Sequence, residues 1–146
     1  MMSKKFMLSD EKKQIGNVVL FRVKALINTK FFKKGELGGW IEKESNLSQD
    51  GDAWVYNNAQ VSGNAWIYGN ARVYGDAWIY GDAQVSGNAR VSGDARVCGK
   101  VRLQSVLYSR FIFKFDWQIE LWKKKEKEFE KENVIEPSKN PTTKSL

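Results

Sequence analysis

Apolar and polar residues follow a six-residue period from Gly51 to Gln104. The repeated phrase is Gly, Asp or Asn, Ala, a variable residue, Val or Ile, and Tyr or Ser. Nine copies follow one another in frame: GDAWVY, NNAQVS, GNAWIY, GNARVY, GDAWIY, GDAQVS, GNARVS, GDARVC and the degenerate copy GKVRLQ. The third and fifth residues lie on one side of an extended segment, and the Gly-Asp or Gly-Asn pair forms a corner. The pattern therefore predicts a solenoid of short strands, whose repeats bury their apolar side by stacking.

Three corners close a triangle, so three phrases predict one coil, and the nine phrases predict coils over residues 51–68, 69–86 and 87–104. Coils are expected about 4.8 Å apart, with Val, Ile and Ala filling a narrow prism. The expected interior columns are Val55/Val73/Val91, Val61/Ile79/Val97 and Ile67/Val85/Leu103. Between them lie Ala53/Ala71/Ala89, Ala59/Ala77/Ala95 and Ala65/Ala83, the last column ending in Val101.

The N-terminal segment predicts a β-rich cap over residues 1–38. A short strand at residues 4–8, a turn at residues 9–11 and a strand from Asn17 to Asn28 are expected. Residues 39–50 keep the six-residue frame and predict a degenerate lead-in coil, with Ile41 and Leu47 in the Ala column, so the β-helix covers residues 39–104. The cap is expected to cover the open edge of the first coil, because an unpaired edge invites aggregation.

The six-residue period ends after Gln104, and residues 105–133 predict an aromatic strand followed by a helix. The alternation of Phe111, Phe113, Phe115 and Trp117 with Ile112, Lys114 and Asp116 indicates a strand that closes the far end of the prism. Asp116 is expected to cap a charged helix from Trp117 to about Asn133, with Trp117, Leu121 and Trp122 on its apolar side and Glu120 paired with Lys124. Residues 134–146 are predicted to be disordered.

Rotated to begin at Val, the phrase resembles the hexapeptide repeat of left-handed parallel β-helices, which implies the left hand of the coils. The run Gly35-Glu-Leu-Gly-Gly-Trp-Ile-Glu-Lys-Glu-Ser-Asn-Leu-Ser, leading into GDAWVY, is similar to a family of hexapeptide-repeat proteins widespread in phages and prophages. This resemblance covers about residues 4–104. It implies an all-β solenoid and a place in the cytoplasm of a bacterial host. Relatives often continue with further repeats after residue 104, so the aromatic and charged residues there depart from the family pattern.

Charge and composition narrow the class of protein. The net charge of +7 lies mostly outside the repeats: residues 1–50 hold ten basic against six acidic residues, and the repeats five against four. Such an excess of positive charge favours solubility. An alternative is that it attracts an acidic protein or a nucleic acid as a partner. No apolar run approaches the length of a membrane span, and one cysteine, Cys98, allows no internal disulfide. A cytosolic protein that does not enter a membrane is expected, with Cys98 facing outward.

Enzymatic groups are missing from the sequence. The chain has no histidine, whereas the acyltransferases with this fold use a histidine base, and no long loop for an acyl donor interrupts the phrases. Asp52, Asp76, Asp82 and Asp94 share their position with Asn and are interpreted as turn formers and not as calcium ligands. The sequence therefore predicts a protein that is not an enzyme and that has no metal and no cofactor.

The outward positions hold the candidate binding residues. Neighbouring coils are expected to place Arg against Trp, a cation–π contact, and Trp, Tyr and Arg are the residue types that dominate interface hot spots. One alternative is that these side chains only stabilise the outer sheet surface; another is base stacking on single-stranded nucleic acid, which no basic groove supports. The predicted partner-binding residues are Trp54, Tyr56, Trp66, Tyr68, Tyr74, Trp78, Tyr80, Arg72, Arg90 and Arg96.

Together these features predict a non-enzymatic binding protein that occludes or adapts a host protein or ribonucleoprotein complex. Its most concrete form is an inhibitor of a bacterial defence nuclease that resembles anti-CRISPR proteins. Two alternatives remain: a structural solenoid that self-assembles as a trimer or polymer, and an acyltransferase-like or nucleotide-binding protein.

Overall fold

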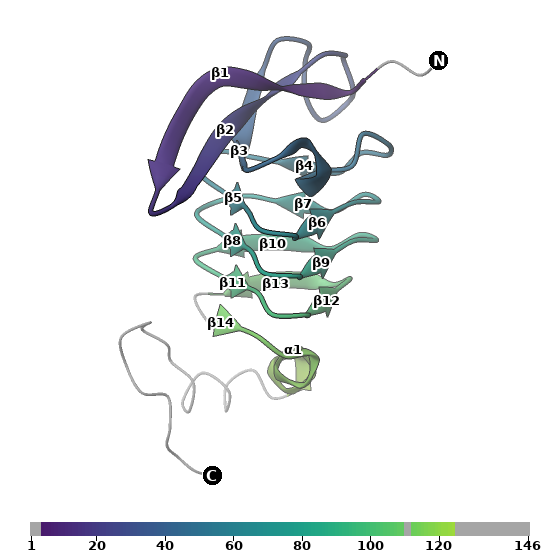
Figure 1. Ribbon diagram of the computed structural model, residues 1–146. Coiled ribbons are helices and arrows are strands. Elements are labelled where there is room, and N and C mark those ends of the chain that lie inside the picture. The colour runs from purple at the N-terminus through teal and green to yellow at the C-terminus, as the bar shows by residue number, and fades with distance from the viewer. Residues whose placement is uncertain (1–3, 110–111, 125–146) are drawn as a thin grey trace.

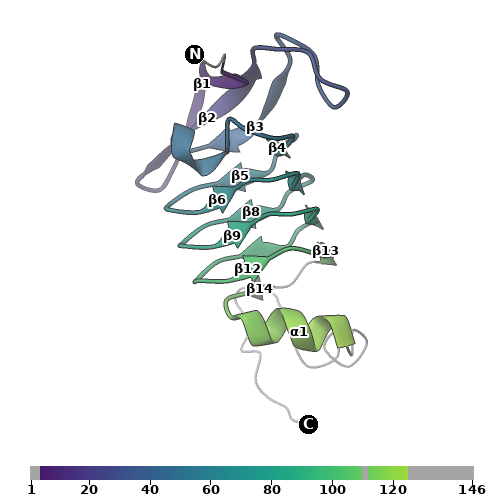
Figure 2. The ribbon, with the colours of Figure 1, turned by 90° about the vertical axis from the view of Figure 1, so that its right-hand side faces the viewer.

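The structure is a computed structural model that describes residues 4–109 and 112–124. A hairpin lies across one end of a stack of triangular coils, and a helix lies across the other end (Figure 1). Seen from the side, the coils are evenly stacked and their corners project in rows (Figure 2). No helix in the described residues is long and apolar enough to cross a membrane.

Within the coils, the strands on each side of the prism pair in parallel with those of the next coil, so the predicted parallel β-helix is confirmed. One side has the order β1-β2-β3-β5-β8-β11-β14, the second β13-β10-β7-β4 and the third β12-β9-β6. The coil strands are β4 (Trp54–Val55), β5 (Gln60–Val61), β6 (Trp66–Ile67), β7 (Arg72–Val73), β8 (Trp78–Ile79), β9 (Gln84–Val85), β10 (Arg90–Gly93), β11 (Arg96–Val97), β12 (Arg102–Leu103), β13 (Val106–Ser109) and β14 (Ile112–Phe113).

The interior columns lie in the predicted register. Val55 pairs with Val73, Val61 with Ile79, and Ile67 with Val85, so each residue meets its counterpart three phrases later. The Val, Ile and Ala side chains of the columns are almost completely buried. Because every coil puts the same small apolar residues inside, the prism is narrow and packed along its whole length.

The corners depend on residues that accept a positive φ. Gly81 has φ +68°, and a Cβ on it would lie 3.0 Å from the backbone nitrogen of Gly99 in the next coil. Asn57, with φ 54°, takes the place of glycine at one corner, as Asn tolerates this conformation better than other L-residues. The Gly-Asp and Gly-Asn pairs are thus required by backbone geometry and by the close stacking of corners.

The N-terminal cap is a long antiparallel hairpin that continues one side of the prism. Strands β1 (Phe6–Ile15) and β2 (Val18–Ala25) pair with each other, and β3 (Leu37–Ile41) joins β2 to β5. The predicted strand at Asn17–Asn28 is found over Val18–Ala25. The predicted turn at residues 9–11 is wrong: these residues lie within β1, at an irregularity in the pairing between Leu8 and Lys12. A bulge absorbs the polar residues there without ending the strand.

The lead-in coil is present, but its register differs from the prediction. Ile41 pairs with Val61, and Leu47 forms a bridge with Ile67, so both lie in the Val and Ile columns and not in the Ala column. The chain from Leu47 to Val55 is longer than one phrase, which leaves two additional residues at that corner. A short 3-10 helix, η1 (Glu44–Asn46), forms the corner before Leu47.

The coils continue beyond Gln104, contrary to the predicted end of the period. Leu107 pairs with Val91 and Phe113 with Val97, and each interval is two residues short of three phrases, so the last coil is shorter at one corner. The predicted strand through Phe115 and Trp117 is therefore wrong, because the chain turns after β14 into helix α1 (Asp116–Lys124). Phe111, the continuation of the helix to Asn133 and the predicted disorder of residues 134–146 lie outside the described residues.

Helix α1 covers the end of the prism largely with the predicted face, since Trp122 is buried and Leu121 packs against the core, but Trp117 is not part of it. Ile119 and Trp122 are buried, and the Trp122 ring meets Phe113 edge-on at 6.3 Å. Trp117, predicted on the apolar side, is 61% exposed. The i, i+3 spacing of Ile119 and Trp122 places them on one side of the helix. Glu120 forms an ion pair with Lys123 at 3.4 Å; the side chain of Lys124, its predicted partner, is not described.

Side chains complete the backbone hydrogen bonds that the coils leave open at both ends. Between coils, bonds such as the one from the Trp54 N–H to the Ala71 carbonyl repeat down the stack. The carbonyl of Ala53 has no coil above it, and the Lys5 ammonium donates to it at 2.7 Å. The N–H of Arg102 has no equivalent coil below it, and the Asp116 carboxylate accepts from it at 2.8 Å. Both ends are thereby protected from further strand pairing.

Candidate functional site

The prism divides the ten predicted binding residues among its three sides, and one of them is buried. Trp54 is 1% exposed: Phe32 stacks on its ring at 3.9 Å and Phe6 meets it edge-on at 6.4 Å. Trp54 is therefore a core residue beneath the cap. This burial corrects the prediction that its side chain lies on an outward binding surface. The repeat puts Trp54 in an outward position, but the loop between β2 and β3 brings Phe32 over it.

On the side formed by β5, β8 and β11, the predicted stacking of Arg and Trp is found. The guanidinium of Arg96 lies 5.4 Å from the ring centre of Trp78, and the Trp78 indole N–H donates to the Ser62 hydroxyl at 3.4 Å. Burial, followed by the hydrogen bond with Cys98, raises the pKa of Tyr80 to about 12. Cys98, predicted to face outward, is buried. Side chains on this side mainly contact each other.

On the side formed by β4, β7 and β10, the aromatic residues also pair among themselves. Tyr56 and Tyr74 stack at 5.2 Å. Burial raises the pKa of Tyr56, with smaller effects from nearby charges, of which Arg72 acts in the opposite direction. The guanidinium of Arg72 lies 3.5 Å from the ring centre of Phe31. Phe31 belongs to the loop between β2 and β3, the cap loop, and this contact was not predicted from the sequence. Nothing in the repeat signals it, because Phe31 lies outside the repeated phrases.

The side formed by β6, β9 and β12 presents the most exposed tryptophan of the repeats. Trp66 is 42% exposed, and its ring stacks on Tyr68 at 3.9 Å with an interplanar angle of 24°. The Tyr68 hydroxyl donates to the Gln84 side-chain oxygen at 3.2 Å. Tyr68, whose hydroxyl is held by Gln84, thus covers one face of the indole, while the ring remains partly exposed. The indole N–H of Trp66 has no hydrogen-bond partner within the described residues.

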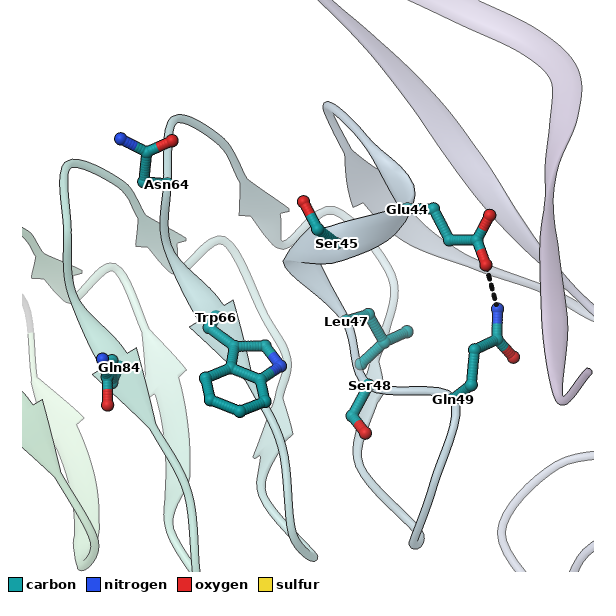
Figure 3. Close-up of a pocket in the computed structure, with 8 residues that line it drawn as sticks. All are labelled: Glu44, Ser45, Leu47, Ser48, Gln49, Asn64, Trp66 and Gln84. Atoms are coloured by element: carbon teal, nitrogen blue, oxygen red, sulfur yellow. Dashed lines mark hydrogen bonds between the residues drawn. The ribbon is translucent and has the colours of Figure 1, made fainter.

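A shallow groove of about 670 Å³ lies beside Trp66, between this side of the prism and the lead-in coil. In Figure 3 the indole stands at the centre of the groove with its N–H edge toward Leu47 and Ser48, while Glu44 and Gln49 form the far wall. The Gln49 amide donates to Glu44 at 3.0 Å, and Lys4 forms an ion pair with Glu44 at 3.3 Å. The lining residues are Glu44, Ser45, Leu47, Ser48, Gln49, Asn64, Trp66 and Gln84.

Buried polar contacts keep the lead-in coil in place beside the groove. Asn46 is fully buried, and its amide donates to the carbonyls of Gly63 and Ala65 at 3.1 and 2.9 Å. Its side-chain oxygen accepts from the N–H groups of Glu42 and Lys43 at 3.0 and 2.8 Å. Because both donors and both lone pairs of this amide are used, the wall of the groove is rigid.

The groove has the chemistry of a binding surface. It offers an aromatic face, one carboxylate, hydroxyls and amides, with no lysine or arginine among its lining residues. Within residues 4–109 and 112–124, no group of three His, Cys, Asp or Glu side chains lies close enough to hold a metal. The repeated phrase predicts Trp66 and Tyr68 as outward residues, but it does not predict the groove wall formed by residues 44–49, because these depart from the phrase.

Comparison with protein families identifies the repeats. Residues 65–81 and 83–99 match the family model described as YdcK Beta solenoid repeat. The chain carries β-solenoid repeats. The matched residues form β6 to β11 and include Trp66, whereas the cap and α1 lie outside the match. No curated protein matches the chain.

Proposed function

We propose that the protein is a non-enzymatic binding protein that docks a protein surface of a host complex in the groove beside Trp66. The observation that carries this proposal is the exposed indole, which is stacked on Tyr68 and has its N–H free of a partner within the described residues. A preordered aromatic ring with an unused donor is typical of an interface hot spot. The β-solenoid behind it is stiff, so little ordering entropy is lost on binding.

The charge of the groove favours a protein over a nucleic acid as the partner. Its only charged lining residue is Glu44, which repels phosphate, although Lys4 partly neutralises it. Single-stranded nucleic acid requires a basic path beside the aromatic ring, and the arginines of the repeats lie on other parts of the prism or lower on this side. A polypeptide with an apolar side chain for the indole and polar groups for Gln49, Asn64 and Gln84 fits this lining.

The most specific form of the proposal is occlusion of a bacterial defence nuclease, in the manner of an anti-CRISPR protein. It rests on the similarity of the run from Gly35 through the first phrases to phage hexapeptide-repeat proteins. The absence of histidine from the sequence supports inhibition by occlusion over inhibition by catalysis. A stiff surface that covers a partner's active site needs no chemistry of its own.

The test is affinity purification of the tagged protein from a bacterial lysate treated with nuclease, in three forms: wild type, Trp66→Ala and Trp117→Ala. Trp117 is a matched control, because it is also exposed but lies on α1, away from the groove. We expect wild type and Trp117→Ala to retain one stoichiometric protein complex and Trp66→Ala to lose it. With the purified partner, Trp66→Ala should weaken Kd at least about tenfold, or about 1.4 kcal/mol. Equal affinity of all three forms would refute this site.

One observation favours the alternative of self-assembly. Phe115 and Trp117 are 55% and 61% exposed and stack on each other at 6.3 Å, at the end of the prism opposite the cap. Adjacent exposed aromatic rings form apolar surface, and contiguous apolar surface is where interaction sites are found. Light scattering over a dilution series separates the two functions: an assembling solenoid dissociates in the Trp117→Ala form and stays assembled in the Trp66→Ala form.

A further inference from the structure

A second cavity, of about 200 Å³, lies on another side of the prism, where the cap loop passes beside β7 and β10. This cavity shares no lining residue with the groove beside Trp66. Its walls come from the cap loop, from the variable position of two phrases and from one column of corners. The lining residues are Lys30, Phe31, Asp52, Asn70, Arg72, Asn88 and Arg90.

Arg72 is the central residue of this cavity, and its charge is unbalanced. Its guanidinium carbon lies 3.5 Å from the ring centre of Phe31, and its Nε is buried without a hydrogen-bond partner. The ion pairs found within the described residues involve Lys4, Arg22 and Lys123, and none involves Arg72, Arg90 or Lys30. A buried donor on a charged group costs free energy unless an acceptor satisfies it.

The stacking of coils places a second arginine directly beside the first. Arg72 and Arg90 are register partners on adjacent parallel strands, about 4.8 Å apart along the stack. Like charges in this relation repel each other. Lys30 adds a third cation, 5.4 Å from the ring centre of Phe31. Stacking on an aromatic ring orients the guanidinium of Arg72 and reduces its freedom, which prepares it for a planar, two-pronged contact.

The corner column supplies neutral donors and only one negative charge. Asn70 and Asn88 occupy the same position of phrases one coil apart, below Asp52. The lining therefore has three cations and one carboxylate, which leaves two positive charges in excess. Glu36 acts on the neighbouring Tyr56 hydroxyl but does not line the cavity.

We propose that this cavity binds a phosphate monoester or free phosphate through Arg72, Arg90 and Lys30. A dianion neutralises the excess of two positive charges, whereas a carboxylate or a phosphodiester neutralises one. Guanidinium groups bind phosphate oxygens in pairs of charge-assisted hydrogen bonds, and Arg72 and Arg90 both line the cavity. The small volume fits one phosphate group and leaves the rest of any larger ligand outside. This site is independent of the groove at Trp66.

The test is calorimetric titration of the whole protein at low ionic strength with three probes: inorganic phosphate, phenyl phosphate and dimethyl phosphate. We expect saturable binding of the two dianions and at least tenfold weaker binding of the diester, which carries one charge. Phosphate and phenyl phosphate distinguish the sources, since a site for monoesters retains phenyl phosphate at least as well as the free ion. The proposal is overturned if the diester binds as tightly as the dianions. It is also overturned if the dianions show no saturable binding below about 10 mM, which corresponds to about 3 kcal/mol of binding free energy.

Two variants localise the binding. Arg90 and Arg102 both occupy the variable position of a phrase and are both exposed, but Arg102 lies on the side formed by β6, β9 and β12. Arg90→Gln should weaken phosphate affinity at least tenfold, and Arg102→Gln less than twofold. Lys30→Gln, in the cap loop, provides a second variant that removes charge without touching the coils. If Arg102→Gln weakens binding as much as Arg90→Gln, the effect is general charge and the site is refuted.

Discussion

Trp54 and Trp66 occupy the same position of the repeated phrase, two phrases apart, in opposite environments. Trp54 lies beneath the cap between Phe6 and Phe32, and it is 1% exposed. Trp66 lies on the side that the cap leaves open, and it is 42% exposed. The repeat thus decides on which side of the prism a tryptophan lies, and the segments outside the repeat decide whether that side is core or surface.

The largest expected effect separates these two residues by stability. Trp54→Ala removes a buried ring and its contacts with Phe6 and Phe32, so we expect the free energy of unfolding to fall by about 3–5 kcal/mol. Trp66→Ala removes a half-exposed ring and should cost about 1 kcal/mol or less. Urea unfolding of both variants measures the difference. Similar losses for the two would contradict the assignment of Trp54 to the core.

The next effect concerns Lys5, a buried cation whose ammonium donates to the carbonyl of Ala53. Burial lowers the pKa of Lys5 to about 8, against the opposing attraction of Asp52 and Asp50. Between about pH 8 and pH 10 the unfolded state binds a proton that the folded state has released, so the free energy of unfolding rises with pH. At about 1.4 kcal/mol per pKa unit, the gain approaches about 3 kcal/mol at most.

Chemical unfolding from about pH 7 to pH 9.5 measures this rise, and Lys5→Met is the control, which should remove most of the slope. Measurement stops there because Tyr56 and Tyr80 act in the opposite direction: their raised pKa values make the unfolded state lose protons first above about pH 10. An unchanged slope in Lys5→Met would show that Lys5 does not titrate in this range.

A smaller loss of stability is expected for a change in the lead-in coil, which forms one wall of the groove beside Trp66. Asn46→Ala leaves the carbonyls of Gly63 and Ala65 without their donor, which should lower the free energy of unfolding by about 2–3 kcal/mol. Asn64→Ala is the matched control, because Asn64 is exposed and its side chain hydrogen-bonds only exposed side chains; it should cost about 0.5 kcal/mol or less. Thermal unfolding compares them, and equal losses would argue against a role for Asn46 in fixing the coil.

The smallest effect tests the support of the exposed indole. Tyr68→Phe keeps the ring stacked on Trp66 and removes the hydrogen bond to Gln84, so we expect a loss of about 0.5–1 kcal/mol. Tyr74→Phe is the control, since the Tyr74 hydroxyl makes no hydrogen bond within the described residues. Urea unfolding of both variants measures the two losses. A larger loss in Tyr74→Phe would contradict this account.

Much of the fold is predictable from the six-residue period because the same interaction repeats from coil to coil. A Val in the fifth position of one phrase has to lie on the Val three phrases later, as Val55, Val73 and Val91 do. Prediction failed where coil length changes. The interval from Ile41 to its partner is three phrases plus two residues, and the interval from Phe113 back to its partner is three phrases less two residues. A corner can gain or lose two residues without moving the strands that it joins.

The sequence by itself therefore determined the prism, its apolar columns and the side on which each outward residue lies, because these follow from a local period and from stacking. Only the tertiary structure decided which outward residues are accessible. Phe31 and Phe32 come from a loop outside the repeat, and they convert Trp54 into core and Arg72 into the wall of a cavity. The groove at Trp66 likewise depends on the lead-in coil held by Asn46. Contacts between segments distant in sequence leave no period, and they create both candidate sites.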